Sequence, residues 1–170
     1  FDIELLYKVP VDRLGMPGDF QIRALGTNTQ ELSTTAGGTK LEAAGYAAGV
    51  PHWVWNVNLD YALDRFGAGL MIKYASHVGY NNQLIGPDDP AYSPTLANSV
   101  NRNQWPQSVY FNLNARYDLI DDGRRKLQLY GVVNNLFDKQ PPLVAGVLFT
   151  GGSPYDTIGR AFRIGARFQY

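Results

Sequence analysis

Cysteine is absent from this chain of 170 residues, which excludes disulfide bonds and metal sites built from thiolates. Net charge is also absent, because 15 basic residues balance 15 acidic ones. The composition therefore predicts neither a nucleic-acid-binding surface nor a polybasic membrane anchor. The longest apolar run, Leu143–Phe149, is far shorter than the roughly 18 residues of a transmembrane helix. Hydropathy would still miss a transmembrane β-barrel, because each of its strands gives only a weak signal.

Signatures of catalysis are missing as well. The sequence contains no phosphate-binding loop, no nucleophile elbow and no metalloprotease helix. We therefore expect no enzymatic activity, no cofactor and no bound metal. No signal peptide and no initiator Met precede Phe1, which already belongs to an alternating pattern. We expect the chain to begin within a strand and to be part of a longer or processed protein.

Strand patterns dominate what is present. Aromatic residues make up 13% of the sequence, and 18 Gly and 10 Pro favour turns and strands over long helices. The segment 159–170 (GRAFRIGARFQY) shows the pattern clearly. One parity is apolar: Phe162, Ile164, Ala166, Phe168 and Tyr170. The other is polar, cationic or small: Arg163, Gly165, Arg167 and Gln169. Such a strand has one apolar and one polar face.

The same alternation predicts an all-β fold of about seven strands, at residues 1–9, 19–31, 52–63, 66–80, 108–119, 126–135 and 159–170. Short connections at 10–18, 64–65 and 121–123 alternate with long ones at 34–50, 81–107 and 138–158. This regularity predicts an antiparallel up-and-down sheet with tight turns at one end and long loops at the other.

Two hairpins have a predicted register. A two-residue turn at Asp64–Arg65 gives the apolar pairs Leu63–Phe66, Tyr61–Ala68, Leu59–Leu70 and Val57–Ile72. A three-residue turn at Asp121–Gly123, with Gly123 in the left-handed region, gives Tyr117–Leu127, Ala115–Leu129, Leu113–Gly131 and Phe111–Val133. In the second hairpin this register also places Asp118 opposite Lys126, as a pair of opposite charges.

Loop asymmetry and strand length favour a segment of a transmembrane β-barrel. Strands of about 10 residues, tilted near 45°, cross an apolar band of about 25 Å. The apolar parity carries no charge in the third, fifth and seventh strands, and aromatic residues gather near strand ends as in interfacial girdles. A soluble β-sandwich or barrel remains an alternative. Seven antiparallel strands do not close an up-and-down barrel, so further strands are expected before Phe1.

The segment 130–139 (YGVVNNLFDK) resembles a motif near the end of TonB-dependent outer-membrane receptors. The resemblance continues through Pro141–Pro142, Tyr155–Asp156 and residues 158–160 to the terminal aromatic strand. It implies that residues 1–170 are the C-terminal portion of a plugged barrel of about 22 strands, without the plug domain. It also implies the outer membrane of a Gram-negative bacterium as the location. Its partners would be membrane lipid, the remaining barrel and plug, and the TonB complex through an N-terminal part absent here.

The implied function is active uptake of a scarce small ligand, such as a siderophore, a cobalamin-like cofactor or an oligosaccharide, bound at extracellular loops. A passive porin-like barrel and a soluble β-sheet ligand-binding module are the alternatives. The candidate ligand-binding residues are His52, His77, Tyr92, Trp105 and Tyr155. Tyr46 is a further loop aromatic. The two histidines face each other across the first hairpin, near the long-loop end, and two imidazoles suit a metal or an iron-bearing ligand.

Each candidate also has a plainer interpretation. The histidines suit a polar wall, and the loop aromatics suit packing within the loops. Asp88, Asp89 and Asp138 belong to turns. Of the adjacent amides, Asn134 faces the polar side and Asn135 ends the strand. The cations of the polar parity are interpreted as solvated wall charges: Arg23, Lys73, Arg116, Arg163 and Arg167.

Overall fold

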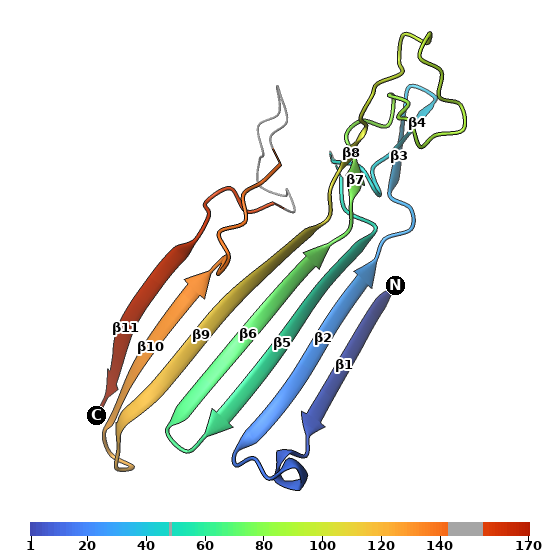
Figure 1. Ribbon diagram of the computed structural model, residues 1–170. Helices are drawn as coiled ribbons and strands as arrows, with labels where there is room; N and C mark the ends of the chain where they lie inside the picture. Colours follow the sequence, from blue (N-terminus) through green and yellow to red (C-terminus); the bar gives the residue numbers. More distant parts are fainter. Residues whose placement is uncertain (48, 143–154) are drawn as a thin grey trace.

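A computed structural model describes residues 1–47, 49–142 and 155–170, and in that part of the chain the protein is all-β (Figure 1). The long strands are β1 (Asp2–Val9), β2 (Asp19–Asn28), β5 (Trp53–Leu63), β6 (Phe66–Ala75), β9 (Ser108–Asp121), β10 (Lys126–Asn134) and β11 (Ala161–Gln169). The short ones are β3 (Ser33–Ala36), β4 (Thr39–Glu42), β7 (Val78–Gly79) and β8 (Gln104–Trp105). A 3₁₀ turn, η1 (Val11–Leu14), lies in the connection between β1 and β2.

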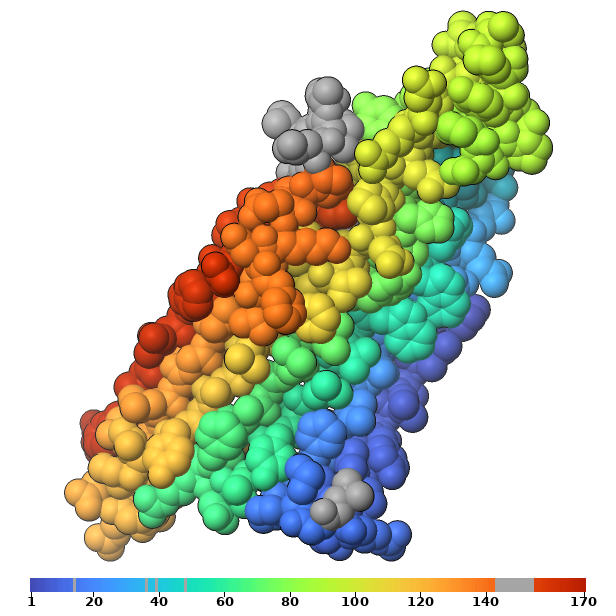
Figure 2. Space-filling view, viewed as in Figure 1, coloured from blue at the N-terminus to red at the C-terminus, as the bar shows by residue number. Residues whose placement is uncertain are grey.

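The seven long strands form one antiparallel sheet in the order β1-β2-β5-β6-β9-β10-β11. Each strand therefore pairs with its neighbours among the long strands along the chain, as the alternation predicted. The sheet does not close into a barrel: β1 and β11 lie at opposite edges. Figure 2 shows the strands as one slanting slab, with the loop residues gathered beyond one end. Among the described residues, no helix is long and apolar enough to cross a membrane.

Three predicted segments were wrong in their details. The strand predicted at 19–31 ends at Asn28, and the region predicted as a loop at 34–50 contains the β3–β4 hairpin. Its turn residues, Gly37 and Gly38, both have positive φ, as a tight two-residue hairpin turn requires. The strand predicted at 66–80 ends at Ala75, because the Ser76 hydroxyl accepts the Trp53 N–H and closes the ladder. Beyond it, β7 pairs with β8 within the loop region.

The predicted register of the first hairpin is confirmed in all four pairs. The register of the second was wrong by two residues, since Tyr117 lies opposite Leu129. Three features explain the error. Strand β9 continues to Asp121, a bulge leaves Leu119 extra on β9, and the Asp122 carboxylate accepts the N–H of Arg125 at 2.7 Å and holds a later turn.

Two expectations for that hairpin survive the change of register. Gly123 has φ +80, in the predicted left-handed region. Asp118 and Lys126 still form an ion pair at 3.4 Å, although Gln128 rather than Lys126 lies opposite Asp118. Lys126 also reaches Asp121, its direct cross-strand neighbour, at 3.3 Å. Because the shift is even, every side chain keeps its predicted face.

The sheet has one apolar face and one polar face. A single register row crosses all seven strands on the apolar face: Tyr7, Ile22, Leu59, Leu70, Leu113, Val133 and Phe162. No charged side chain lies on this face in the described strands. Described residues leave most of this face uncovered: Phe162 is 70% exposed and Ile164 is 88% exposed, whereas near the loop end the Phe137 ring packs on Phe111. The strand charges lie on the opposite face, together with the strand asparagines other than Asn28, which lies opposite Trp53 at the loop end of the apolar face.

Most buried apolar side chains lie at the loop end of the sheet; Val11, in the β1–β2 connection, and Tyr110, on the polar face of β9, are buried elsewhere. At the loop end, Val78, Trp105 and Tyr155 form a cluster, with Ala47 and Tyr80 packed against it. We call these five residues the loop core. They come from all three long connections, so the loop core joins these connections above one end of the strands.

Candidate ligand-binding site

The loop core holds its aromatic rings by direct contact. The Trp105 ring lies 5.8 Å from the Tyr155 ring and 5.9 Å from the Tyr80 ring. The Tyr155 hydroxyl donates a hydrogen bond to the Pro106 carbonyl, and burial raises the pKa of Tyr155 to about 12. The Ala47 N–H donates to the Gly79 carbonyl at 2.8 Å, which ties the β2–β5 connection to the β6–β9 connection. The three connections are therefore packed against one another.

The turn after β10 is organised around Asn135. This side chain is 1% exposed and its backbone has φ +49, a conformation that Asn tolerates better than most residues. Its amide donates to the Lys139 carbonyl at 3.0 Å and accepts the Lys139 N–H at 2.8 Å. Its own N–H donates to the Asn112 side chain on β9. Asn135 thus fixes the turn to the sheet, in agreement with its interpretation as a strand-ending residue.

Asp138, in the same turn, positions the start of β11. Its carboxylate accepts the N–H of Arg160 at 2.9 Å. Just before this point, the N–H of Asp156 donates to the Tyr110 hydroxyl at 3.0 Å. These two bonds hold residues 155–160 over the polar face near the loop end of β9 and β10.

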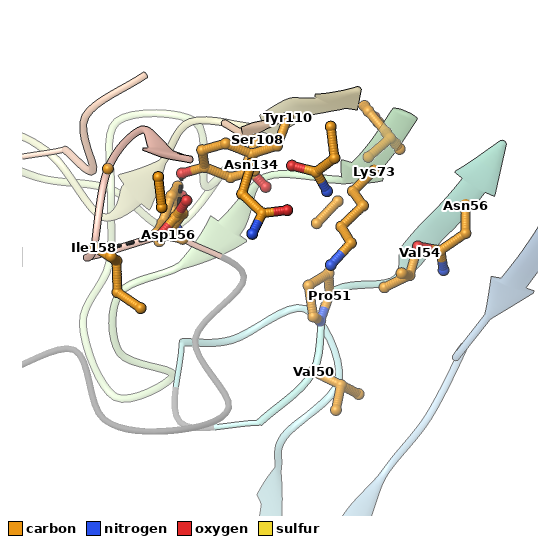
Figure 3. A pocket seen from close by; sticks show the side chains of 16 residues that line it. Val50, Pro51, Val54, Asn56, Lys73, Ser108, Tyr110, Asn134, Asp156 and Ile158 are labelled. Atoms are coloured by element: carbon orange, nitrogen blue, oxygen red, sulfur yellow. Dashed lines mark hydrogen bonds between the residues drawn. The ribbon is translucent and has the colours of Figure 1, made fainter. Parts of the chain in front are cut away.

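A pocket of about 630 Å³ lies between this segment, residues 50–51 and the polar face of the sheet (Figure 3). Its wall includes Asn56 of β5, Lys73 of β6, Tyr110 of β9 and Asn134 of β10. Apolar side chains complete the rim: Val50, Pro51, Val54 and Ile158. Four neighbouring strands and two connections therefore contribute to one site.

Several of the polar side chains in this pocket have no hydrogen-bond partner among the described residues. In the described part of the chain, the side chains of Asn56, Lys73 and Asn134 make no hydrogen bond or ion pair. Asp156 also lines the pocket, but its carboxylate accepts the N–H of Ile158 at 2.9 Å and belongs to a local turn. The arrangement offers one free ammonium group and two free amides to a ligand.

The candidate histidines lie together at a separate place. His52 and His77 are exposed and line a shallow depression with Phe1, Trp53 and Ser76. His52 Nδ1 is 2.7 Å from the Thr29 carbonyl, which makes this nitrogen a hydrogen-bond donor. Among the described residues, no group of three metal-ligating side chains occurs. The site in Figure 3 therefore does not contain the histidine pair.

The candidate aromatics are not brought into one surface. Trp105 and Tyr155 are buried in the loop core, although Tyr155 also contributes to the pocket wall. Tyr92 is half-buried in the β6–β9 connection, where its N–H bonds to the Asp89 carbonyl, and it does not line the pocket. Sequence reasoning named Lys73 and Asn134 only as polar-face residues and did not single out Asn56. Their shared parity was the available signal, but their convergence depends on the sheet register.

Comparisons with known proteins add no identification: no family model, no curated protein and no solved structure matches this chain.

Proposed function

We propose that this chain forms part of the wall of an outer-membrane β-barrel, and that the barrel is a TonB-dependent receptor that takes up a small ligand. The observation that carries the proposal is the apolar face of the sheet, which crosses seven strands without a charge and which the described residues leave largely uncovered. The sequence resemblance over residues 130–170 supplies the particular family.

The size of the apolar face supports a lipid environment. Seven strands at about 4.8 Å spacing and nine residues at about 3.3 Å rise give roughly 1,000 Å² in projection. The largest exposed apolar patch of an ordinary soluble monomer is about 300–600 Å². At about 25 cal/mol per Å², leaving this face in water would cost roughly 25 kcal/mol. Such a face requires a covering, and bilayer hydrocarbon provides one.

The aromatic residues at the two ends of the strands favour lipid, rather than a second layer of protein, as the covering of the apolar face. At the loop end, the rings of Trp53 and Trp55 stack at 5.8 Å, and Phe1 packs edge-on against Trp53 at 5.6 Å. At the turn end, Tyr61 and Tyr117 lie on the same apolar face. Two aromatic belts separated by an aliphatic band are typical of barrels at the two membrane interfaces.

Site-directed spin labelling tests the membrane assignment. The 170 residues contain no cysteine. A single cysteine introduced at position 57, 58, 59 or 60 of β5 therefore carries the one spin label in this part of the protein, and the label reports the surroundings of that position. The complete protein encoded by the gene is used, with cysteines elsewhere replaced by serine, in outer-membrane vesicles. We expect high collision rates with oxygen at 57 and 59, and high rates with a water-soluble nickel chelate at 58 and 60. Low rates with both reagents at 57 and 59 would indicate a protein core and refute the proposal.

A second measurement tests the transport class. Ligand uptake by cells that express the complete protein should stop when the TonB protein of the host is deleted, because a plugged barrel needs energy from the inner membrane. Uptake that continues unchanged in the deletion strain would indicate the passive porin-like alternative. The spin-label pattern of β5 should be identical in both strains.

A further inference from the structure

The polar groups that line the pocket in Figure 3 restrict the class of ligand that it can bind. We propose that it binds a hydroxyl-rich organic acid, such as an oligosaccharide of uronic acids, with a ligand carboxylate on Lys73 and ligand hydroxyl groups on Asn56 and Asn134. This inference rests on the proposed function, because it names the class of ligand that the receptor takes up.

Lys73 makes the pocket suited to an anion. Among the described residues that line the pocket it is the one cation, and the one acid, Asp156, has its carboxylate engaged by the Ile158 N–H. Its cross-strand neighbours are Asn56 on one side and Tyr110 on the other, so no acid adjoins it in its register row. No described carboxylate lies within ion-pair distance of its ammonium group. A ligand carboxylate would supply the missing counter-charge through charge-assisted hydrogen bonds.

The two amides make the rest of the site suited to hydroxyl groups. Each Asn side chain offers two N–H donors and one carbonyl acceptor, which matches a hydroxyl group that both donates and accepts. Asn56 lies directly beside Lys73, and Asn134 lies further along the wall on β10. Pro51 and Ile158 add apolar surface for the C–H faces of a sugar ring. The volume of about 630 Å³ suits a ligand larger than one sugar ring.

A matched pair of ligands tests this assignment. Titration calorimetry on the complete protein in detergent compares α-1,4-linked digalacturonate with α-1,4-linked galactobiose, which has the same linkage but no carboxylate. We expect digalacturonate to bind at least tenfold more tightly. Lys73→Gln should weaken digalacturonate binding roughly 10- to 100-fold and remove most of the preference for digalacturonate over galactobiose. Lys73→Arg should retain the preference for the acid. Lys8→Gln, the same change elsewhere on the polar face, should alter neither affinity.

Each outcome separates the inference from the proposed function. Equal affinity for the two sugars, no measurable binding of digalacturonate, or full affinity in Lys73→Gln would overturn the ligand assignment. If the alternating spin-label pattern of β5 persists in that case, the barrel proposal stands. Conversely, Lys73-dependent binding of digalacturonate without the spin-label pattern would retain the site and place it in a soluble binding module.

Discussion

An arginine placed on the apolar face should destabilise the protein in a way that depends on depth. Leu70 lies near the middle of β6, between Leu59 and Leu113 in the register. Phe66 lies at the turn end of the same face. Relative to the alanine variant at the same position, arginine should cost about 2–4 kcal/mol at Leu70 and about 0–1 kcal/mol at Phe66. The first value corresponds to roughly 30- to 700-fold in the folding equilibrium.

The adjacent residue provides the control for face. Met71 points to the polar side, between Asn58 and Asn112. Met71→Arg should therefore change stability by about 1 kcal/mol or less. The measurement is reversible urea unfolding of the complete protein in phosphatidylcholine bilayers, followed by tryptophan fluorescence. Equal losses for Leu70→Arg and Met71→Arg would refute the assignment of faces. Equal losses at Leu70 and Phe66 would refute the assignment of depth.

Three further predictions concern packing, turns and acid. Gly26→Ala should cost about 1–3 kcal/mol and reduce the near-UV circular dichroism of the tryptophan pair, because a Cβ there would lie 2.6 Å from the Trp55 ring. Gly131→Ala, on the same face, should do neither, because the nearest atom to its Cβ would be the Arg163 carbonyl oxygen at 4.0 Å. Asn135→Ala should cost about 2 kcal/mol or more in urea unfolding, by leaving buried backbone groups unpaired, whereas Asn134→Ala should be nearly neutral. The N–H groups of Leu32 and then Ala44 lower the pKa of Glu42 in the β3–β4 hairpin. Glu42 therefore stabilises that hairpin above its unfolded-state pKa, and the protection factors of these two amides, corrected for the intrinsic slowing of exchange in acid, should fall as pH drops through its lowered pKa; unchanged protection factors would contradict this.

The sheet could be predicted from the sequence because the faces of each strand are determined by alternation within a single segment. Alternation in single segments, such as residues 53–63, specifies which side chains share a face, and the seven-strand order follows from connection lengths. The second register was missed because it depends on Asp122, whose carboxylate competes with the predicted turn. The β3–β4 hairpin was missed because its strands are short and polar, although Gly37–Gly38 was a usable turn signal.

The candidate site was harder to predict from the sequence than the sheet. Trp105 and Tyr155 were named as candidates for ligand binding, but contacts between separate connections bury them, which agrees better with the plainer interpretation as loop packing. Asn56 and Asn134 are far apart in the chain and reach one pocket only through the order of the strands and the position of residues 155–160. Such convergence requires knowledge of tertiary structure, whereas the polarity of each residue does not.

The loop core has a consequence for motion. Because Ala47, Trp105 and Tyr155 belong to three different connections and share one cluster, the described part of any one connection cannot leave the loop core without exposing buried side chains of the others. Movements of these loops are therefore coupled, and opening is a concerted event with a single rate rather than three independent fluctuations. The amides of Ala47 and Gly79, which bond across two connections, report that rate through hydrogen exchange.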